Sequence, residues 1–253
     1  MSKLELTDID YWDKKRKFFK PYHPKNNEFY EFLNAYLPKR PEWSCAEIGG
    51  YPGSHLVFCA KNFGYKPVAI EFSNYTEHIQ DMFEFNEIEN FEIINKNFFE
   101  IENRAFDIVL SFGFIEHFTK LEEVFSKHIE MLKPGGYLAL SVPNFKGFQG
   151  WLRRHTMQKE FFDELWATHN PEAMSENFFL NMADQHNLDV IFCGARLKGD
   201  LWIDSHSSEI RSNRKWVISL YHFLQKLVRP FLPSNMWISP IIVMVARKRL
   251  ESV

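Results

Sequence analysis

The stretch Glu47-Ile48-Gly49-Gly50-Tyr51-Pro52-Gly53 decides the fold, because a short apolar strand at 45–48 runs directly into a glycine-rich turn. A helix is predicted over 56–63, and Gly64 closes it, since glycine is preferred just past a helix end. Strand, turn and helix therefore follow in order. Glycines in such a turn let a ligand approach the backbone closely, so the turn is a candidate binding site.

Further strands and helices alternate outward from this unit. Strands are predicted at 67–72, 91–95, 106–112, 137–142, 188–197 and 241–246, and helices at 26–37, 75–86, 119–132 and 175–187. The helix near 119 begins with a capping box, Thr119-Lys120-Leu121-Glu122, and stops at Lys133-Pro134-Gly135-Gly136, because proline cannot continue it. This alternation predicts an α/β protein whose parallel sheet is covered by helices on both faces.

The chain divides into an N-terminal helical segment at 1–42 and a main domain at 43–253. The main domain carries two predicted insertions, at about 144–172 and 199–239. In the second insertion, apolar residues form a stripe along a predicted amphipathic helix at 215–231. The favoured interpretation is packing on the protein's own core or on a second subunit of a homodimer. Peripheral contact with a membrane surface is the alternative.

The composition is that of an ordinary globular protein, with 253 residues of which 45% are hydrophobic and 25% charged. The net charge of −3 lacks the basic excess of nucleic-acid binders, so no nucleic-acid partner is expected. Cys45, Cys59 and Cys193 are far apart and form no CxxC pair, which argues against disulfides and a zinc site; no metal is predicted. Since neither a signal segment nor a membrane-spanning apolar run is found, a cytoplasmic location is expected.

Charge at the glycine-rich turn indicates the kind of ligand. A dinucleotide-binding turn would need glycines where Tyr51 and Ser54 stand, and the carboxylate of Glu47 would repel a pyrophosphate. That carboxylate would instead attract a cation such as an ammonium group. Glu71 ends the second strand 24 residues after Glu47, close to the offset of about 20 residues at which an acid binds ribose hydroxyls.

Residues near the ends of the neighbouring strands complete an adenosine site. Asn97 is placed to bond an adenine edge, and Phe72 or Phe98 to supply an apolar face. The same site is predicted to include Gly49, Gly50, Gly53 and Ser111. An adenosine that carries an amino-acid-like cation instead of phosphates is S-adenosylmethionine, which is therefore the predicted cofactor.

The motifs also resemble those of the class I S-adenosylmethionine-dependent methyltransferases that act on small molecules. The resemblance runs from about 43 to 143 and includes Glu47-x-Gly49-x-x-x-Gly53, Glu71, 106–110, 115–118 and Leu-Lys-Pro-Gly-Gly at 132–136. Two positions depart from the family pattern: Tyr51 stands where many members have glycine, and Asn97 where many have aspartate. The resemblance implies a Rossmann-like sheet of seven strands, parallel except for one.

Three residues are candidates for catalysis. Methyl transfer from a sulfonium is an in-line displacement, so most of the catalysis comes from holding the acceptor about 3 Å from the methyl group. A hydroxyl acceptor gains from a base, and His117 is the first candidate because the reference pKa of histidine, about 6.5, is near working pH. Bonding to nearby backbone is its structural alternative. Glu116 is a second acid or a turn residue, and His169 is by resemblance a base or substrate ligand, or else a surface-loop residue.

Acceptor binding is predicted at two places. Tyr11, Trp12 and His23 lie in the N-terminal segment, which by resemblance often folds over the cofactor, although simple packing is an equal alternative. Arg153 and Arg154 would hold an anionic acceptor by bidentate bonds, or else belong to a solvated helix face.

The sequence therefore predicts an enzyme that methylates an oxygen of a small polar acceptor. A sugar, or a phosphorylated or acidic precursor of a bacterial surface polysaccharide, is the specific suggestion. N-methylation of a small amine is the second hypothesis, and a non-catalytic binding module on the same fold is the third. By resemblance, the lack of Asn-Pro-Pro-Tyr and Pro-Cys motifs disfavours methylation of nucleic-acid bases.

Overall fold

The computed structural model describes residues 5–200 and 207–250. Residues 1–4 of the predicted N-terminal segment, 201–206 of the second predicted insertion, and 251–253 lie outside the described residues.

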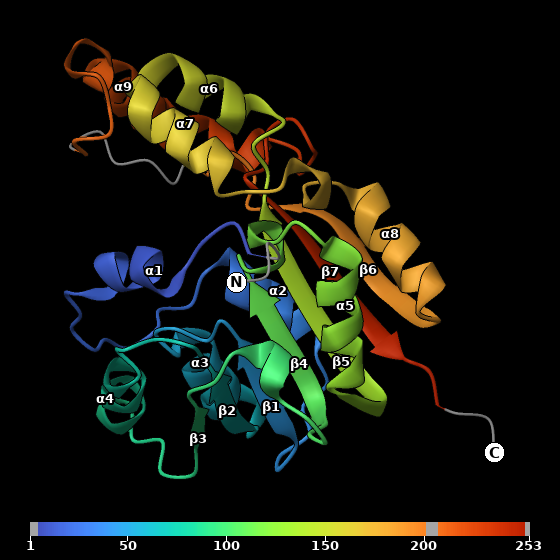
Figure 1. The fold of residues 1–253 in the computed structure, drawn as a ribbon. Helices are drawn as coiled ribbons and strands as arrows, with labels where there is room; N and C mark the ends of the chain where they lie inside the picture. The colour runs from blue at the N-terminus through green and yellow to red at the C-terminus, as the bar shows by residue number, and fades with distance from the viewer. Residues whose placement is uncertain (1–4, 201–206, 251–253) are drawn as a thin grey trace.

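Seven strands form one sheet in the order β3-β2-β1-β4-β5-β7-β6 (Figure 1). Their bounds are β1 Ser44–Ile48, β2 Lys66–Ile70, β3 Glu92–Ile94, β4 Phe106–Phe112, β5 Leu132–Pro143, β6 Leu188–Arg196 and β7 Ile241–Lys248. β7 runs antiparallel to its neighbours β5 and β6, and the other pairs are parallel. The predicted α/β fold with one antiparallel strand is confirmed.

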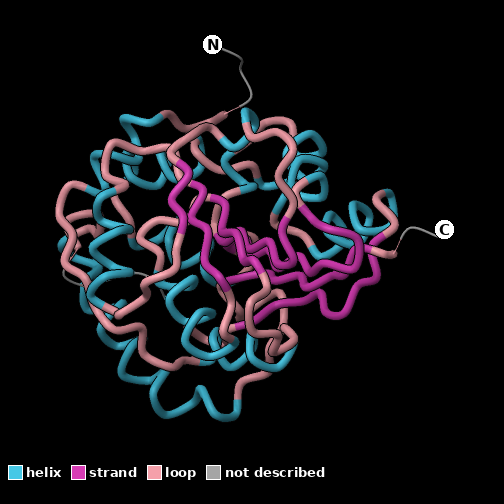
Figure 2. Tube along the Cα trace, turned by 90° about the horizontal axis from the view of Figure 1, so that it is seen from below, coloured by secondary structure: helices cyan, strands magenta, loops and turns pink. Residues whose placement is uncertain are grey.

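Helices cover both faces of this sheet (Figure 2). They are α2 Glu28–Tyr36, α3 Ser54–Phe63 and α4 Glu77–Phe85 on one face, and α5 Leu121–Glu130 and α8 Glu176–Gln185 on the other. Each face of the sheet contributes to its own apolar cluster, so every central strand is buried on both sides. The helix predicted over 26–37 begins at Glu28, where the Asn27 side chain caps it by accepting a hydrogen bond from the Tyr30 N–H at 3.0 Å.

Strand register brings the functional turns to one edge of the sheet. Ile48 pairs with Ile70 on one side, and Glu47 pairs with Leu110 on the other. The chain therefore leaves β1, β2 and β4 at nearly the same level. In open parallel sheets this carboxyl edge, at the point where strand order reverses, is where ligands bind.

Two sequence predictions near β5 were wrong in detail. α5 begins at Leu121 with Lys120 rather than Thr119 at the N-cap, and the Lys120 side chain makes no capping bond, so the helix begins one residue later than the predicted capping box requires. Residues 133–136, predicted as a turn, lie within β5. The pairing of β5 with β4 shifts register there, and Gly135 has a φ of +79°, so these residues form an irregularity inside the strand.

The two insertions form a helical cap above the carboxyl edge of the sheet (Figure 1). It consists of α6 Phe148–Thr156, α7 Lys159–Ala167 and α9 Lys215–Val228. A small separate core holds the cap together: Leu152, Met157, Ile210 and Ile218. α9 confirms the helix predicted within 215–231.

The outer side of α9 is exposed. Ile218 is its one buried residue, whereas Trp216 is 61% exposed, Phe223 62% and Leu227 60%. Packing on the protein's own core thus accounts for one side of the helix, and contact with a second subunit or a membrane surface stays a prediction. Among the described residues, no helix is both long and apolar enough to cross a membrane.

Candidate active site

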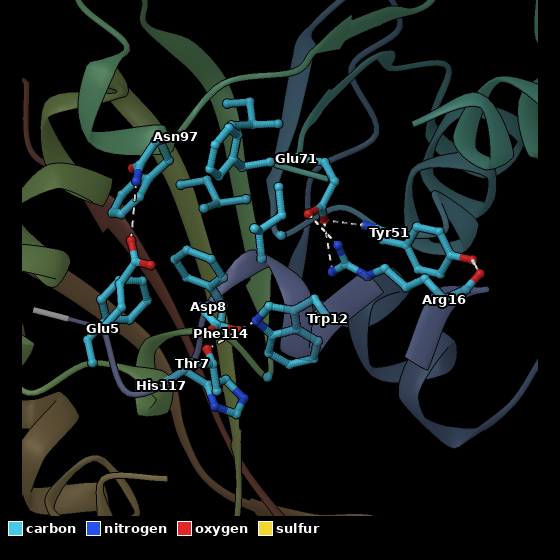
Figure 3. Close-up of a pocket in the computed structure, with 18 of the residues that line it drawn as sticks. Glu5, Thr7, Asp8, Trp12, Arg16, Tyr51, Glu71, Asn97, Phe114 and His117 are labelled. Carbon is cyan, nitrogen blue, oxygen red and sulfur yellow. Dashed lines mark hydrogen bonds and ion pairs between the residues drawn. The ribbon is translucent and has the colours of Figure 1, made fainter. Parts of the chain in front are cut away.

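A cavity of about 320 Å³ lies at the carboxyl edge of β1, β2 and β4 (Figure 3). Its floor comes from the turn after β1, the end of β2, the segment around Asn97 and the segment after β4. The short helix α1 (Ile9–Arg16) covers it from the N-terminal side. Of the residues predicted from the sequence, it is lined by Gly49, Glu71, Phe72, Asn97, Phe98, His117 and Trp12.

Glycine is required at the turn for steric reasons. Gly49 has a φ of +69°, and a Cβ there would lie 2.8 Å from Cδ2 of Phe114. Gly53 caps α3 at a φ of +93°, where a Cβ would crowd Ile79 and Phe83. Gly49 faces the cavity, whereas Gly50 and Gly53 lie behind its wall and shape the turn.

Glu71 presents its carboxylate at the cavity and is held from two sides. Arg16 of α1 donates to both of its oxygens, at 2.7 and 3.3 Å, and the Tyr51 N–H donates to Oε2 at 3.2 Å (Figure 3). Burial raises the pKa of Glu71, and the Arg16 guanidinium offsets part of that rise. The carboxylate predicted to bind ribose hydroxyls is thus engaged by the N-terminal helix in this structure.

The side chain of Glu47 does not line the cavity. Its carboxylate is buried beneath the turn, where Oε1 lies 2.7 Å from Nδ1 of His55. Its other oxygen has no hydrogen-bond partner among the described residues. A direct contact between Glu47 and a ligand ammonium therefore stays a prediction, and the structure places His55 between the carboxylate and a neighbouring cavity.

Three predicted cofactor contacts lie on the far wall of the cavity, and one does not. Phe72 and Phe98 supply apolar surface, and Asn97 lies beside Phe98. The side-chain oxygen of Asn97 accepts from the Phe99 N–H at 3.0 Å, and its amide nitrogen donates to Glu5 at 3.2 Å. Ser111 is buried within β4, outside the cavity wall.

The N-terminal segment closes over the cavity chiefly through two residues. Trp12 packs edge-on against the imidazole of His117, with ring centroids 4.9 Å apart, and Arg16 lies 4.7 Å from the ring centroid of Tyr51. Tyr51 stands where many family members have glycine. It therefore forms part of the contact between the cavity wall and α1, which acts as a lid over the cavity. Tyr11 packs on Trp12 outside the cavity, and His23 lies near Asn86 on another surface.

Glu116, His117 and His169 form a compact polar cluster beside the cavity. The rings of His117 and His169 have centroids 4.4 Å apart, and Nε2 of His117 lies 4.0 Å from Oε1 of Glu116. Nδ1 of His117 lies 2.6 Å from the Thr168 carbonyl, and Nδ1 of His169 lies 2.7 Å from the Leu165 carbonyl. The structure thus brings together the three residues predicted for catalysis, although His169 is 169 − 116 = 53 positions from Glu116 in the sequence.

Burial changes the acid–base behaviour of this cluster. It raises the pKa of Glu116 to about 8 and, with the neighbouring His169, lowers the pKa of His117 to about 3. It also lowers the pKa of His169 to about 4. Both imidazoles are therefore neutral at pH 7, and His117 is a weaker base than its reference pKa suggested.

The two arginines predicted to bind an anionic acceptor point in different directions. Arg153 is buried, with its guanidinium 5.0 Å from the centroid of Phe145, and burial lowers its pKa to about 10. Arg154 is exposed and lies over Phe162 on the outer side of the cap. Neither lines the cavity below α1, so the structure does not bring them together as a clamp.

A second cavity of about 530 Å³ lies beside the first, among the start of α2, the ends of β4 and β5, the start of β7, and the residues Asp200 and Arg229. The two share Phe112 and Gly113 in their walls. Polar residues are frequent in the second cavity: Asn27, Glu28, His55, Ser141, Asp200 and Arg229. Sequence reasoning missed this cavity and the lid residue Arg16, because neither follows from a local motif.

Fold and site together define a Rossmann-like methyltransferase. The cavity fits S-adenosylmethionine, because a carboxylate on β2, apolar rings and a glycine at positive φ meet at the carboxyl edge where such nucleosides bind.

The chain matches a profile of the methyltransferase domain over residues 9–192, more than half of its length, and belongs to this family. It is an enzyme that takes its methyl group from S-adenosylmethionine, which excludes the hypothesis of a non-catalytic module. No curated protein matches the chain with significance.

Solved structures of similar fold include several methyltransferases. One assigned as a sarcosine dimethylglycine methyltransferase from Galdieria sulphuraria is 14% identical, with a TM-score of 0.60 over 87% of this chain and 85% of that one. Coclaurine N-methyltransferase is 15% identical, with a TM-score of 0.57 over 86% and 71%. Geranyl diphosphate C-methyltransferase from Streptomyces coelicolor is 15% identical, with a TM-score of 0.58 over 87% and 75%.

Proposed function

We propose that this enzyme methylates an oxygen of a small polar acceptor bound in the second cavity. One observation carries the proposal: the two cavities share Phe112 and Gly113 in their walls, and the junction cluster (Glu116, His117 and His169) lies next to these walls. His117 lines the first cavity, and Glu116 lies close to Gly113, where a Cβ would be 3.6 Å from Oε1 of the carboxyl group.

The first cavity is assigned to the methyl donor. Glu71 would bind the ribose hydroxyls, which requires Arg16 to give up at least one of its two bonds to that carboxylate. Phe72 and Phe98 would flank the adenine, with Asn97 at its edge. When bound, S-adenosylmethionine supplies an electrophilic methyl group on a positively charged sulfur. Trp12 and Arg16 of α1 would exclude water from the closed site.

The second cavity is assigned to the acceptor. Its wall offers hydrogen-bonding side chains on several sides, including Ser141, Asn27 and His55, and its volume is within the usual range of small-molecule sites. A hydroxyl-rich acceptor satisfies such a wall. We therefore retain a sugar, or an acidic or phosphorylated sugar precursor of a bacterial surface polysaccharide, as the specific proposal. Since its three cysteines are unpaired thiols, we place the reaction in the cytoplasm.

The chemistry requires positioning and the removal of one proton. The acceptor oxygen attacks the methyl carbon in line with the departing sulfur, so most of the rate enhancement comes from orientation. A hydroxyl must lose its proton as the new bond forms. The junction cluster is the group placed to assist, and its two neutral imidazoles can accept hydrogen bonds there.

N-methylation is the second candidate. Two carboxylates, Glu28 and Asp200, line the second cavity, and both pair with Arg229. A cationic amine could take the place of the arginine at either carboxylate. Coclaurine N-methyltransferase, a structural neighbour, acts on nitrogen by its name.

The test is a methylation assay with isotopically labelled S-adenosylmethionine. Purified enzyme is incubated with a panel of sugars, sugar phosphates, hydroxy acids and amines, and products are resolved by mass spectrometry and NMR. We expect a methyl ether or ester on a hydroxylated compound, and a lower initial rate from Glu71→Ala at cofactor concentrations that just saturate the wild type. Methylation confined to amines would overturn the oxygen assignment.

A further inference from the structure

The junction cluster contains an arrangement that proton transfer alone does not explain. Glu116, His117 and His169 each direct one potential ligand atom inward, and these atoms all lie within 4.8 Å of one another. Glu116 is 1% exposed and His117 5%, whereas one edge of His117 faces the first cavity. Three chemically suitable donors therefore converge in a buried place with one open side.

Hydrogen bonds fix both imidazoles in the form that binds a cation. Backbone carbonyls only accept, so the bonds to the Thr168 and Leu165 carbonyls place the ring proton on Nδ1 in both histidines. Nε2 of each ring is then left with a lone pair. In protein metal sites, ligating histidines are oriented in the same way, by donating their other ring nitrogen to a carbonyl or carboxylate.

The carboxyl group of Glu116 is only partly hydrogen-bonded. Its Oε1 lies 4.0 Å from Nε2 of His117, beyond hydrogen-bond distance. Oε2 of Glu116 has no hydrogen-bond partner among the described residues. A buried carboxyl group in this position is costly unless something positive or hydrogen-bonding occupies the space beside it.

We infer that Glu116, His117 and His169 bind a divalent transition-metal ion beside the methyl-transfer site. Two imidazoles and one carboxylate form a donor set that suits Fe²⁺, Mn²⁺, Co²⁺ or Zn²⁺ and leaves coordination positions open. Mg²⁺ prefers oxygen ligands throughout, so it should bind more weakly.

The ion would require only a small contraction of the cluster. Ligand atoms about 2.1 Å from a common ion are at most ~4.2 Å apart, and roughly 3.4 Å apart in a tetrahedral site. Closing the observed separations, which are at most 4.8 Å, therefore takes shifts of about 1 Å. His117 lines the first cavity, so an ion can reach the cluster from that side.

The role of the ion rests on the proposed function. An acceptor hydroxyl that coordinates the open position would lose its proton to solvent more readily. The oxygen then attacks the methyl carbon, the new O–C bond forms as the S–C bond breaks, and the sulfonium becomes a neutral thioether.

The experiment measures metal binding without any acceptor. Chelator-treated protein is titrated with Zn²⁺ and Mn²⁺ by calorimetry, with Mg²⁺ as the contrast, and Co²⁺ absorption reports the number of nitrogen ligands. We expect one ion per chain, with affinity lowered at least about 100-fold in His117→Ala and His169→Ala and less in Glu116→Gln. The matched control is His155→Ala, because His155 also bonds a carbonyl four residues back but is exposed and outside the cluster.

The outcomes separate the two proposals. Should His117→Ala fail to fold, Glu116→Gln and the Co²⁺ spectrum of the wild type carry the test. Equal affinity in wild type and cluster variants, or no binding at millimolar ion, overturns the metal site. Full methylation of a hydroxyl acceptor by ion-free enzyme overturns the ion's role in catalysis but leaves the proposed function standing. Ion binding through the cluster without methylation of any hydroxyl overturns the proposed function but leaves the metal site standing.

Discussion

The half of the molecule that faces the methyl donor and the half that faces the acceptor are built differently. The donor half consists of β1, β2, β4 and the turns that follow them, within two large apolar clusters that span the sheet. The acceptor half includes the helical cap, which has a small separate core of four buried side chains and an exposed outer helix. In the proposed function, the donor site therefore belongs to the main core of the fold, whereas Asp200 and Arg229 of the second insertion help to line the acceptor site.

The largest expected effect separates the stability of the cap from donor binding. Ile218→Ala removes a fully buried side chain from the cap core and should cost about 2–5 kcal/mol locally. Hydrogen exchange should accelerate in α6, α7 and α9, while the dissociation constant of S-adenosylhomocysteine changes less than twofold. Leu220→Ala, at a 46% exposed position of the same helix, is the control. A large loss of nucleoside affinity in Ile218→Ala would show that the halves are coupled.

The next effect tests the donor half directly. Glu71→Ala should weaken S-adenosylhomocysteine binding roughly 10- to 100-fold, because charge-assisted hydrogen bonds contribute about 1.5–3 kcal/mol. Calorimetry measures the change, and Glu71→Gln separates loss of charge from loss of volume. Glu92→Ala removes a carboxylate that pairs with Arg104 on the surface, and it should leave affinity unchanged. Unaltered binding by Glu71→Ala would remove this residue from the ribose site.

These two predictions show what the sequence could and could not supply. The strands, the glycine turn and the acid at the end of β2 follow from local periodicity and spacing, and the structure places them together. The bond from Arg16 to Glu71 joins residues 55 positions apart. The helix α1 is polar and has no apolar stripe from which its packing face could be predicted. The charge of Glu47 before the first glycine predicts a contact with a ligand ammonium group, whereas spacing alone does not show that its side chain lies under the turn beside His55.

A third effect concerns pH and again belongs to the donor half. His128 of α5 is fully buried against Phe98 and Phe114, and burial lowers its pKa from 6.5 to about 4. Below pH 6.5 the unfolded chain binds the extra proton and the folded chain does not, so stability is lost as pH falls towards 4. Between pH 7 and pH 5 the wild type should lose about 2 kcal/mol through this residue.

Urea unfolding at pH 7 and pH 5 measures that loss. His128→Leu removes the titrating group, so the stability difference between wild type and variant should shift by the same amount between the two pH values. Parallel pH dependences in the two proteins would contradict the assignment.

The smallest effect tests the contact between the lid and the junction. Trp12→Ala removes the edge-on ring contact with His117 and part of the cover over the first cavity. Aromatic pairs contribute about 0.5–1.5 kcal/mol, so S-adenosylhomocysteine should bind roughly 2- to 10-fold more weakly and dissociate faster. Stopped-flow displacement measures the rate. Trp216→Ala, on the exposed face of α9, is the control and should leave the dissociation rate unchanged. An equally unchanged rate in Trp12→Ala would mean that α1 packs on the protein without helping to hold the nucleoside.

A crystal structure with S-adenosylhomocysteine tests the central assignment most directly. The account predicts the nucleoside in the cavity under α1, its ribose hydroxyls on the carboxylate of Glu71, and Arg16 moved away from at least one of the two carboxylate oxygens. A nucleoside bound elsewhere, with the Arg16–Glu71 pair intact, would contradict it.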